Sequence, residues 1–200
     1  VNLEIDKEKR NNARAYHSAT HLLHEALRRT LGKHVTQKGS LVSPEKLRFD
    51  FSHNKPIESI EINKIEKFVN DMVEASSEVK TRIMTTKEAV ENGALALFGE
   101  KYGDEVRVLS MGKEGDSFFS TELCGGTHVR NIKDIGKFKI ISQSSIASGI
   151  RRIEALRDKQ LENYEKQIRE GKSKKEKNTT EEINNIKKEL KSLSITPNYN

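Results

Sequence analysis

The sequence has little cysteine, proline or tryptophan. Its 200 residues include one cysteine, three prolines and no tryptophan. The single thiol, Cys124, excludes a disulfide within the chain, which favours a reducing, cytoplasmic setting. No apolar run approaches the roughly 20 residues of a membrane-spanning helix, and the first ten residues lack the apolar stretch of a signal peptide. We therefore expect no membrane partner. Val1 in place of Met indicates a fragment or a processed chain.

Charged residues are abundant and hydrophobic residues are few. Lysine and arginine number 36 against 30 acidic residues, a net charge of +6, and hydrophobic residues make up 34% of the chain. A folded core is possible at this composition, but part of the chain must be a solvated extension. The positive balance permits a polyanionic partner such as nucleic acid, without proving one.

Hydrophobic periodicity predicts one α+β domain over residues 1–156, with helices packed on a mostly antiparallel sheet. Gly32 stands where a left-handed helix cap is expected, and a polar turn is expected over 37–40. Apolar spacings of three and four predict helices over 12–31, 65–73 and 87–92. Extended patterns predict strands over 47–51, 79–85, 106–111, 118–123, 138–142 and 150–155.

Residues 157–200 are expected to form a helical linker, the start of a truncated C-terminal region. The pattern up to Glu170 is helical but has few apolar positions. The lysine-rich stretch 171–180 is expected to be a solvated break. A helical stripe resumes at Ile183 and the chain trails off after Thr196. This segment has no core of its own.

Two histidines on the first predicted helix have the spacing of a metal-binding pair. His17 and His21 are four residues apart, so their side chains lie on the same helix face. His24 is a rival ligand on that face. Ser18 occupies the position at which a zinc-protease helix carries its catalytic glutamate, so protease chemistry lacks its base. Taken alone, such histidines are more often ordinary surface or core side chains.

A second motif, Cys124-Gly-Gly-Thr-His128, follows a predicted strand. Its two glycines allow a tight bend, so the thiolate and imidazole can bind one side of an ion while the helix pair binds the other. Zinc accepts such nitrogen and sulfur ligands tetrahedrally, whereas thiolate disfavours magnesium and calcium. Two alternatives stay open: Cys124 is a nucleophile activated by His128, or an inert buried thiol.

Five segments in order resemble the editing domain of bacterial alanyl-tRNA synthetases. They are HSATHLLHEAL (17–27), HVTQKGSLV (34–42), LRFDFSH (47–53), ELCGGTHV (122–129) and SIASGIRRIEA (145–155). The histidine and cysteine motifs also occur in the threonyl-tRNA synthetase editing domain and in free-standing alanyl editing proteins. The other three segments favour the alanyl synthetase.

The resemblance implies a zinc-dependent deacylase that hydrolyses tRNA(Ala) mischarged with serine or glycine. Its partners would be the mischarged acceptor end of tRNA(Ala) and the remainder of the parent synthetase. Carried over by motif position, one zinc ion would be bound by His17, His21, Cys124 and His128. Gln37 would place the ester or water, so Gln37 and Cys124 are the candidate catalytic residues. The alternatives are a free-standing trans-editing deacylase and a non-catalytic, zinc-stabilised tRNA-binding module.

Further polar residues close to the motifs are candidate contacts. Thr20, Thr36 and Thr127 are candidates for binding the serine hydroxyl, although a helix, turn or strand-edge role is at least as plausible for each. Candidates for tRNA phosphate contacts are Lys38, Arg48, Arg151 and Arg152. For the adjacent arginines, a strand with one outward side chain and one salt bridge is an equally good interpretation. The motifs contain no obvious carboxylate base.

Overall fold

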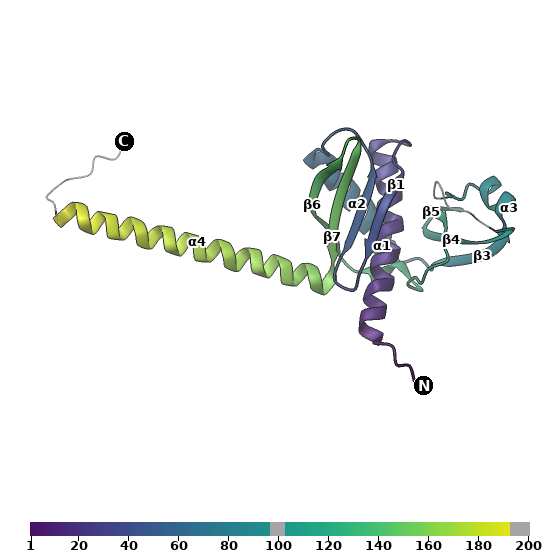
Figure 1. Ribbon diagram of the computed structural model, residues 1–200, viewed down its shortest axis with the longest axis horizontal. Coiled ribbons are helices and arrows are strands. Elements are labelled where there is room, and N and C mark those ends of the chain that lie inside the picture. The colour runs from purple at the N-terminus through teal and green to yellow at the C-terminus, as the bar shows by residue number, and fades with distance from the viewer. Residues whose placement is uncertain (97–102, 193–200) are drawn as a thin grey trace. The chain divides into compact units, whose positions relative to one another are not determined.

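The computed structural model describes residues 1–96 and 103–192, and it divides into two units (Figure 1). The first unit is Val1–Leu161 and the second begins at Glu162. The first unit contains every predicted site residue, and the second contains most of one long helix.

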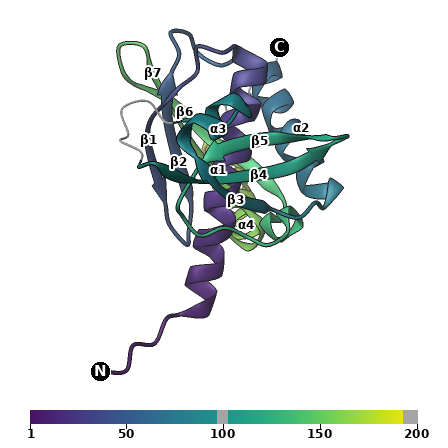
Figure 2. The same ribbon diagram turned by 90° about the vertical axis from the view of Figure 1, so that its right-hand side faces the viewer.

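Two antiparallel sheets build the first unit, which confirms the predicted α+β class. The four-stranded sheet has the order β1-β2-β7-β6 and the three-stranded sheet the order β3-β4-β5 (Figure 2). The strands are β1 (Gln37–Val42), β2 (Leu47–Ser52), β3 (Lys80–Thr85), β4 (Glu105–Glu114), β5 (Ser117–Leu123), β6 (Phe138–Ala147) and β7 (Ile150–Arg157). The helices are α1 (Lys7–Leu31), α2 (Ser59–Ala75), α3 (Thr86–Glu91), the short 3-10 helix η1 (Ile132–Ile135) and α4 (Asp158–Ser192).

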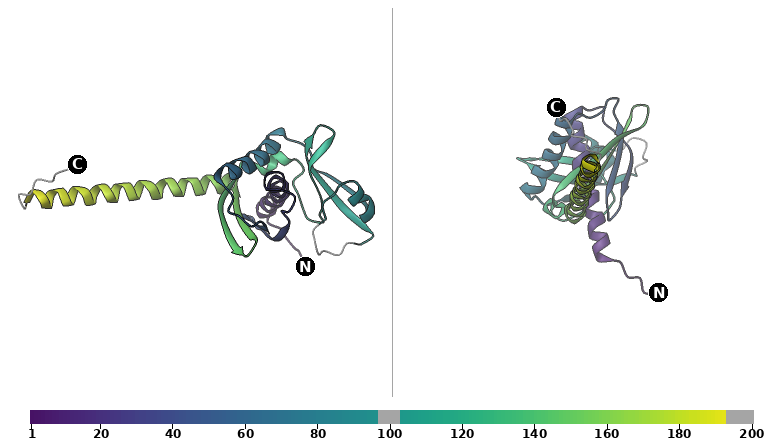
Figure 3. Two further views of the ribbon diagram at one scale, coloured as in Figure 1. Left: turned by 90° about the horizontal axis from the view of Figure 1, so that it is seen from above. Right: turned by 90° about the vertical axis from the view of Figure 1, so that its left-hand side faces the viewer.

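The helix α1 lies between the two sheets and belongs to the larger of two hydrophobic clusters, which includes residues of both sheets. It packs against β1 and β2 on one side and β5 on the other, while α2 packs against β6 and β4. In Figure 3 the purple α1 lies between the green strands of one sheet and the teal strands of the other. The largest fully buried side chains include Tyr16, Leu22, Leu23, Leu27, Phe49, Phe51, Ile65 and Phe138. Because α1 is buried along its middle, His21 lies in the interior, while His17, one turn earlier, is half-buried.

Local chemistry fixes both ends of α1. The carboxylate of Asp6 accepts a hydrogen bond from the backbone amide of Lys9, as a helix-capping aspartate does. Arg28 and Arg29 occupy the last turn, where their charge complements the helix dipole. Gly32 has φ 120° and ψ 165°, so the expected left-handed cap is wrong: its amide bonds to the Arg28 carbonyl, and its carbonyl accepts from the Val35 amide in the turn that follows.

Two other sequence predictions are corrected. Residues 37–40 form strand β1 rather than a polar turn, because their backbone pairs with β2. Residues 171–180 continue α4 without a break. Lysine and glutamate are strong helix formers, and the hydroxyls of Thr179 and Thr180 bond to carbonyls four residues earlier. The trailing segment expected after Thr196 lies outside the described residues.

Among residues 1–96 and 103–192, the structure contains no helix with the length and apolar character needed to cross a membrane.

Candidate metal centre

Four side chains from two distant parts of the chain meet where α1 passes the end of β5. One potential ligand atom from each of His17, His21, Cys124 and His128 lies within 4.8 Å of all the others. The Cys124 sulfur is 3.7 Å from Nε2 of His17 and 3.3 Å from Nε2 of His128. The fold therefore brings together the full ligand set implied by the resemblance.

In each of the three histidines, Nδ1 lies within hydrogen-bond distance of an oxygen. The oxygens belong to the Thr127 carbonyl for His17 (3.3 Å), the Glu122 carboxylate for His21 (2.7 Å) and the Ser18 hydroxyl for His128 (3.2 Å). Such contacts fix the tautomer and ring orientation of metal-binding histidines and leave Nε2 free to bind the ion. The arrangement suits three imidazoles that act on one ion.

Glu122 contacts the histidine cluster, and the sequence motifs alone do not reveal this contact. Its carboxylate is 4% exposed and accepts hydrogen bonds from His21, His24 (3.2 Å) and the Ser120 hydroxyl (3.3 Å). Glu122 lies two residues before Cys124. This closeness to a candidate ligand is the one signal in the sequence that could have pointed to Glu122. His24, the rival ligand, turns its Nδ1 to Glu122 instead, and its ring packs against Phe49 at an interplanar angle of 48°.

Electrostatics couple these groups. Burial disfavours a charged His21, but the adjacent Glu122 carboxylate overrides this effect and raises the His21 pKa to about 10. Burial would raise the Cys124 pKa, yet hydrogen bonds from His128 and His17 lower it to about 3. Burial also lowers the pKa of His128 to about 4. The sulfur is therefore poised as a thiolate, the form that binds metals.

The donor set fits zinc. Nε2 of His21 is buried and has no hydrogen-bond partner among the described residues, so this nitrogen lacks the partner that a buried polar atom requires. An ion bound at the cluster would supply that partner. Three nitrogens and one thiolate are typical zinc ligands, whereas magnesium and calcium prefer oxygen.

Gly126 allows the loop Cys124–His128 to lie close to His17 on helix α1. A Cβ placed there would lie 2.3 Å from Cε1 of His17, whereas a Cβ on Gly125 meets nothing within 4 Å. Arg107 holds the same loop, because its guanidinium donates to the carbonyls of Gly126 and Cys124. Only Gly126 is thus required for the close packing of loop and helix.

The candidate substrate residues take mixed positions. The buried Thr20 hydroxyl donates to the Tyr16 carbonyl on its own helix, and the Thr36 hydroxyl pairs with Ser52. Thr127 is exposed and contributes its backbone carbonyl to His17. Gln37, half-buried, begins strand β1. Substrate contacts by these residues stay predictions.

Most of the candidate phosphate-binding cations already have partners inside the protein. Arg152 donates two hydrogen bonds to Asp50, and Arg48 lies 3.7 Å from the same carboxylate. Arg151 donates to Gln143, while Lys38 is exposed. Arg152 thus takes the salt-bridge role that was the alternative interpretation.

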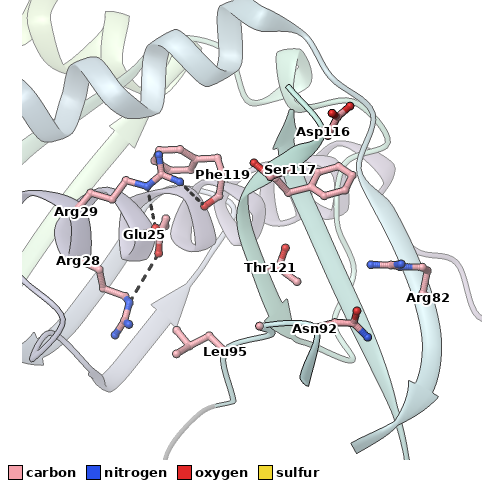
Figure 4. A pocket seen from close by; sticks show the side chains of 12 residues that line it. Glu25, Arg28, Arg29, Arg82, Asn92, Leu95, Asp116, Ser117, Phe119 and Thr121 are labelled. Carbon is pink, nitrogen blue, oxygen red and sulfur yellow. Dashed lines mark hydrogen bonds and ion pairs between the residues drawn. The ribbon is translucent and has the colours of Figure 1, made fainter. Parts of the chain in front are cut away.

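A polar cavity of about 520 Å³ lies beside the C-terminal end of α1, and no metal-centre residue lines it (Figure 4). Two of its three arginines are engaged: Glu25 pairs with both Arg28 and Arg29, and the Arg29 guanidinium lies over the Phe119 ring. The third, Arg82, is exposed.

Comparison with known proteins links this fold and cluster to a family. Residues 106–154 match the family described as "Threonyl and Alanyl tRNA synthetase second additional domain". The chain is 61% identical over 159 residues to an alanine–tRNA ligase of Parvibaculum lavamentivorans, and 60% over 156 residues to one of Sphingopyxis alaskensis. Over these aligned residues the chain is similar to alanyl-tRNA synthetases. An alanine–tRNA ligase of Mesorhizobium japonicum is 56% identical over 161 residues.

These matches confirm the resemblance drawn from the five sequence motifs. Each alignment covers 78% of this chain, and the chain spans 18% of the length of each of these relatives. The likeness to alanyl-tRNA synthetases therefore concerns one section of much longer proteins.

Proposed function

We propose that the chain is the editing part of an alanyl-tRNA synthetase, a zinc-dependent hydrolase that removes serine or glycine from mischarged tRNA(Ala). The observation that carries this proposal is the cluster of three imidazoles and one thiolate, formed by residues about 100 positions apart in the chain. The 56–61% identity to alanine–tRNA ligases supports tRNA(Ala) as the substrate class.

An enzyme that attaches alanine to tRNA needs a separate hydrolytic activity, because its alanine pocket also admits other amino acids. A pocket that holds alanine cannot exclude the smaller glycine sterically, and an apolar pocket rejects an added hydroxyl only weakly. A separate site must then hydrolyse the wrong ester. A site that hydrogen-bonds the serine hydroxyl discriminates against alanine, because alanine leaves its polar groups unpaired.

The residues of the candidate site would have separate roles in the reaction. A bound zinc ion would supply electrostatic stabilisation or polarise an oxygen. His17, His21, Cys124 and His128 would hold it, and the oxygens at their Nδ1 atoms would keep the three imidazoles oriented. Gln37 would position the ester or the attacking water through its amide.

Glu122 is the carboxylate nearest in sequence to the ligand cysteine, but it is unsuited to act as a general base. It is buried, it already accepts hydrogen bonds from two histidines, and the charge and hydrogen bonds of His21 overcome burial to hold its pKa well below the usual range. A weak, enclosed base cannot take a proton from water efficiently. Positioning together with metal electrostatics is the mechanism that the site supports best.

The deciding experiment measures deacylation of Ser-, Gly- and Ala-tRNA(Ala) together with the zinc content. We expect hydrolysis of the first two esters with Ala-tRNA(Ala) spared, strong loss in Cys124→Ala, and slower hydrolysis with unchanged zinc in Gln37→Ala. Gln167→Ala, an exposed position on α4, is the control. Zinc-loaded protein that binds tRNA but leaves Ser-tRNA(Ala) intact would instead establish a non-catalytic binding module.

A further inference from the structure

A second cavity, of about 360 Å³, adjoins the metal centre on the side of His128. Its lining includes Asn11, Arg14, His128, Arg130, Asp134 and Arg157. Three arginines and one aspartate therefore line the same space. This excess of positive charge lies directly beside a candidate metal ligand.

Arg157 contributes a positive charge to one side of this cavity, and its side chain is held in place by hydrogen bonds. It is 6% exposed, and its guanidinium donates to the carbonyls of Ile135 and Asp134 and to the side chain of Asn12. These partners are neutral, and the guanidinium also forms an ion pair with the Asp158 carboxylate at 3.5 Å. Arg157 is thus held in place by three neutral groups and one carboxylate.

Arg14 and Arg130 are the cations available to a ligand. Arg14 precedes His17 by one helical turn and donates to the neutral side chain of Asn11. Arg130 is exposed and lies two residues after His128. Within residues 1–96 and 103–192, neither arginine forms an ion pair with a carboxylate. Two guanidinium groups without a carboxylate partner among the described residues therefore lie near two candidate ligands of the same centre.

We infer that this cavity binds the phosphodiester backbone of the RNA strand whose acylated end reaches the metal centre. Guanidinium groups match phosphate oxygens in two-point hydrogen bonds. Arg48 and Arg152, by contrast, already face Asp50. We assign phosphate binding to Arg14 and Arg130. That the strand is the acylated end of a tRNA rests on the proposed function.

The test measures the binding of an uncharged RNA minihelix with a single-stranded ACCA end at a series of salt concentrations. The logarithm of the affinity falls as the logarithm of the salt concentration rises. Each cation that neutralises a phosphate of a single strand makes this fall steeper by about 0.7. The Arg14→Ala/Arg130→Ala variant should therefore show a slope shallower than that of the wild type by about 1.4. Arg10→Ala/Arg82→Ala removes the same charge from exposed positions outside this cavity and should keep the wild-type slope. Zinc content and circular dichroism should be unchanged in both double variants.

A minihelix without the ACCA end shows which phosphates are involved. On that RNA, the wild type and the Arg14→Ala/Arg130→Ala variant should bind equally. Equal slopes for the two proteins on the full minihelix, or equal reductions in affinity on both RNAs, would overturn the inference. The outcome is separate from the proposed function, because the wild type can deacylate Ser-tRNA(Ala) whether or not these arginines bind phosphate.

Discussion

Glu122 and His21, 101 residues apart in the chain, form a buried contact of 2.7 Å between a carboxylate oxygen and Nδ1. The contact turns Nε2 of His21 toward Cys124 and the other imidazoles. A carboxylate behind a histidine is a common support of metal sites, since it fixes the tautomer and makes the ligand more basic. Glu122 therefore supports the metal centre without being one of its four candidate ligands.

Glu122→Gln should lower zinc affinity by about 10- to 100-fold. The glutamine cannot provide the negative charge that favours the ion, although it keeps the size of the side chain. The measurement is a competition titration with a zinc chelator. Glu105→Gln, at an exposed position on β4, is the matched control. Wild-type affinity in Glu122→Gln would show that the carboxylate does not support the ion.

Gly126→Ala and Gly125→Ala form a matched pair. The first adds a Cβ 2.3 Å from His17, so either the ring or the loop must move, whereas the second adds a Cβ in open space. We expect Gly126→Ala to lose most zinc binding and deacylation, and Gly125→Ala to retain both. Similar zinc binding in the two variants would mean that the close packing of loop and helix is not needed.

Ser18→Ala should destabilise the protein and loosen the metal centre. The buried Ser18 hydroxyl contacts Nδ1 of His128 and accepts from the backbone amide of Val129. Leaving that amide without a partner costs about 1–3 kcal/mol. Urea unfolding measures this decrease in stability, and zinc titration measures the second effect. Ser145→Ala, at an exposed position, should behave as wild type in both assays.

The pair Asp50–Arg152 predicts part of the acid sensitivity of the fold. Hydrogen bonds from Arg152 lower the pKa of Asp50, against the opposing effect of burial. Because the folded pKa lies below the unfolded one, the pair stabilises the fold fully above about pH 3.9 and loses this contribution as the pH falls through the folded pKa.

Asp50→Asn should therefore be less stable than wild type at pH 7, and its stability should fall less steeply below pH 4. Unfolding midpoints measured across this pH range provide the test. Asp116→Asn, at an exposed aspartate, serves as control. Parallel curves for wild type and Asp50→Asn would contradict the assignment.

Local patterns predict most elements because they reflect local physics. The alternation in Leu47–Phe51 and the spacing of apolar residues before Gly32 correspond to β2 and α1. The prediction of a turn over 37–40 is wrong because this strand is created by pairing with β2, a partner that no local pattern reveals. The prediction of a break in the lysine-rich stretch of α4 is wrong because it gives polarity more weight than helix propensity.

The metal ligands can be named from spacing and resemblance, but their supports cannot. In the sequence, Ser18 stands out only as the wrong residue for a protease, yet it contacts His128, 110 residues away. Glu122 escapes prediction because its importance comes from the approach of α1 to β5. Such contacts depend on tertiary packing, which a single sequence does not display.

Three imidazoles and one thiolate are proposed to bind a single zinc ion. X-ray absorption at the zinc edge of the purified protein tests this binding most directly. We predict one ion per chain with one sulfur at about 2.3 Å and three nitrogens at about 2.0–2.1 Å, the sulfur being absent in Cys124→Ser. Protein that retains no zinc, or zinc whose neighbours are the same in the wild type and in Cys124→Ser, would contradict it.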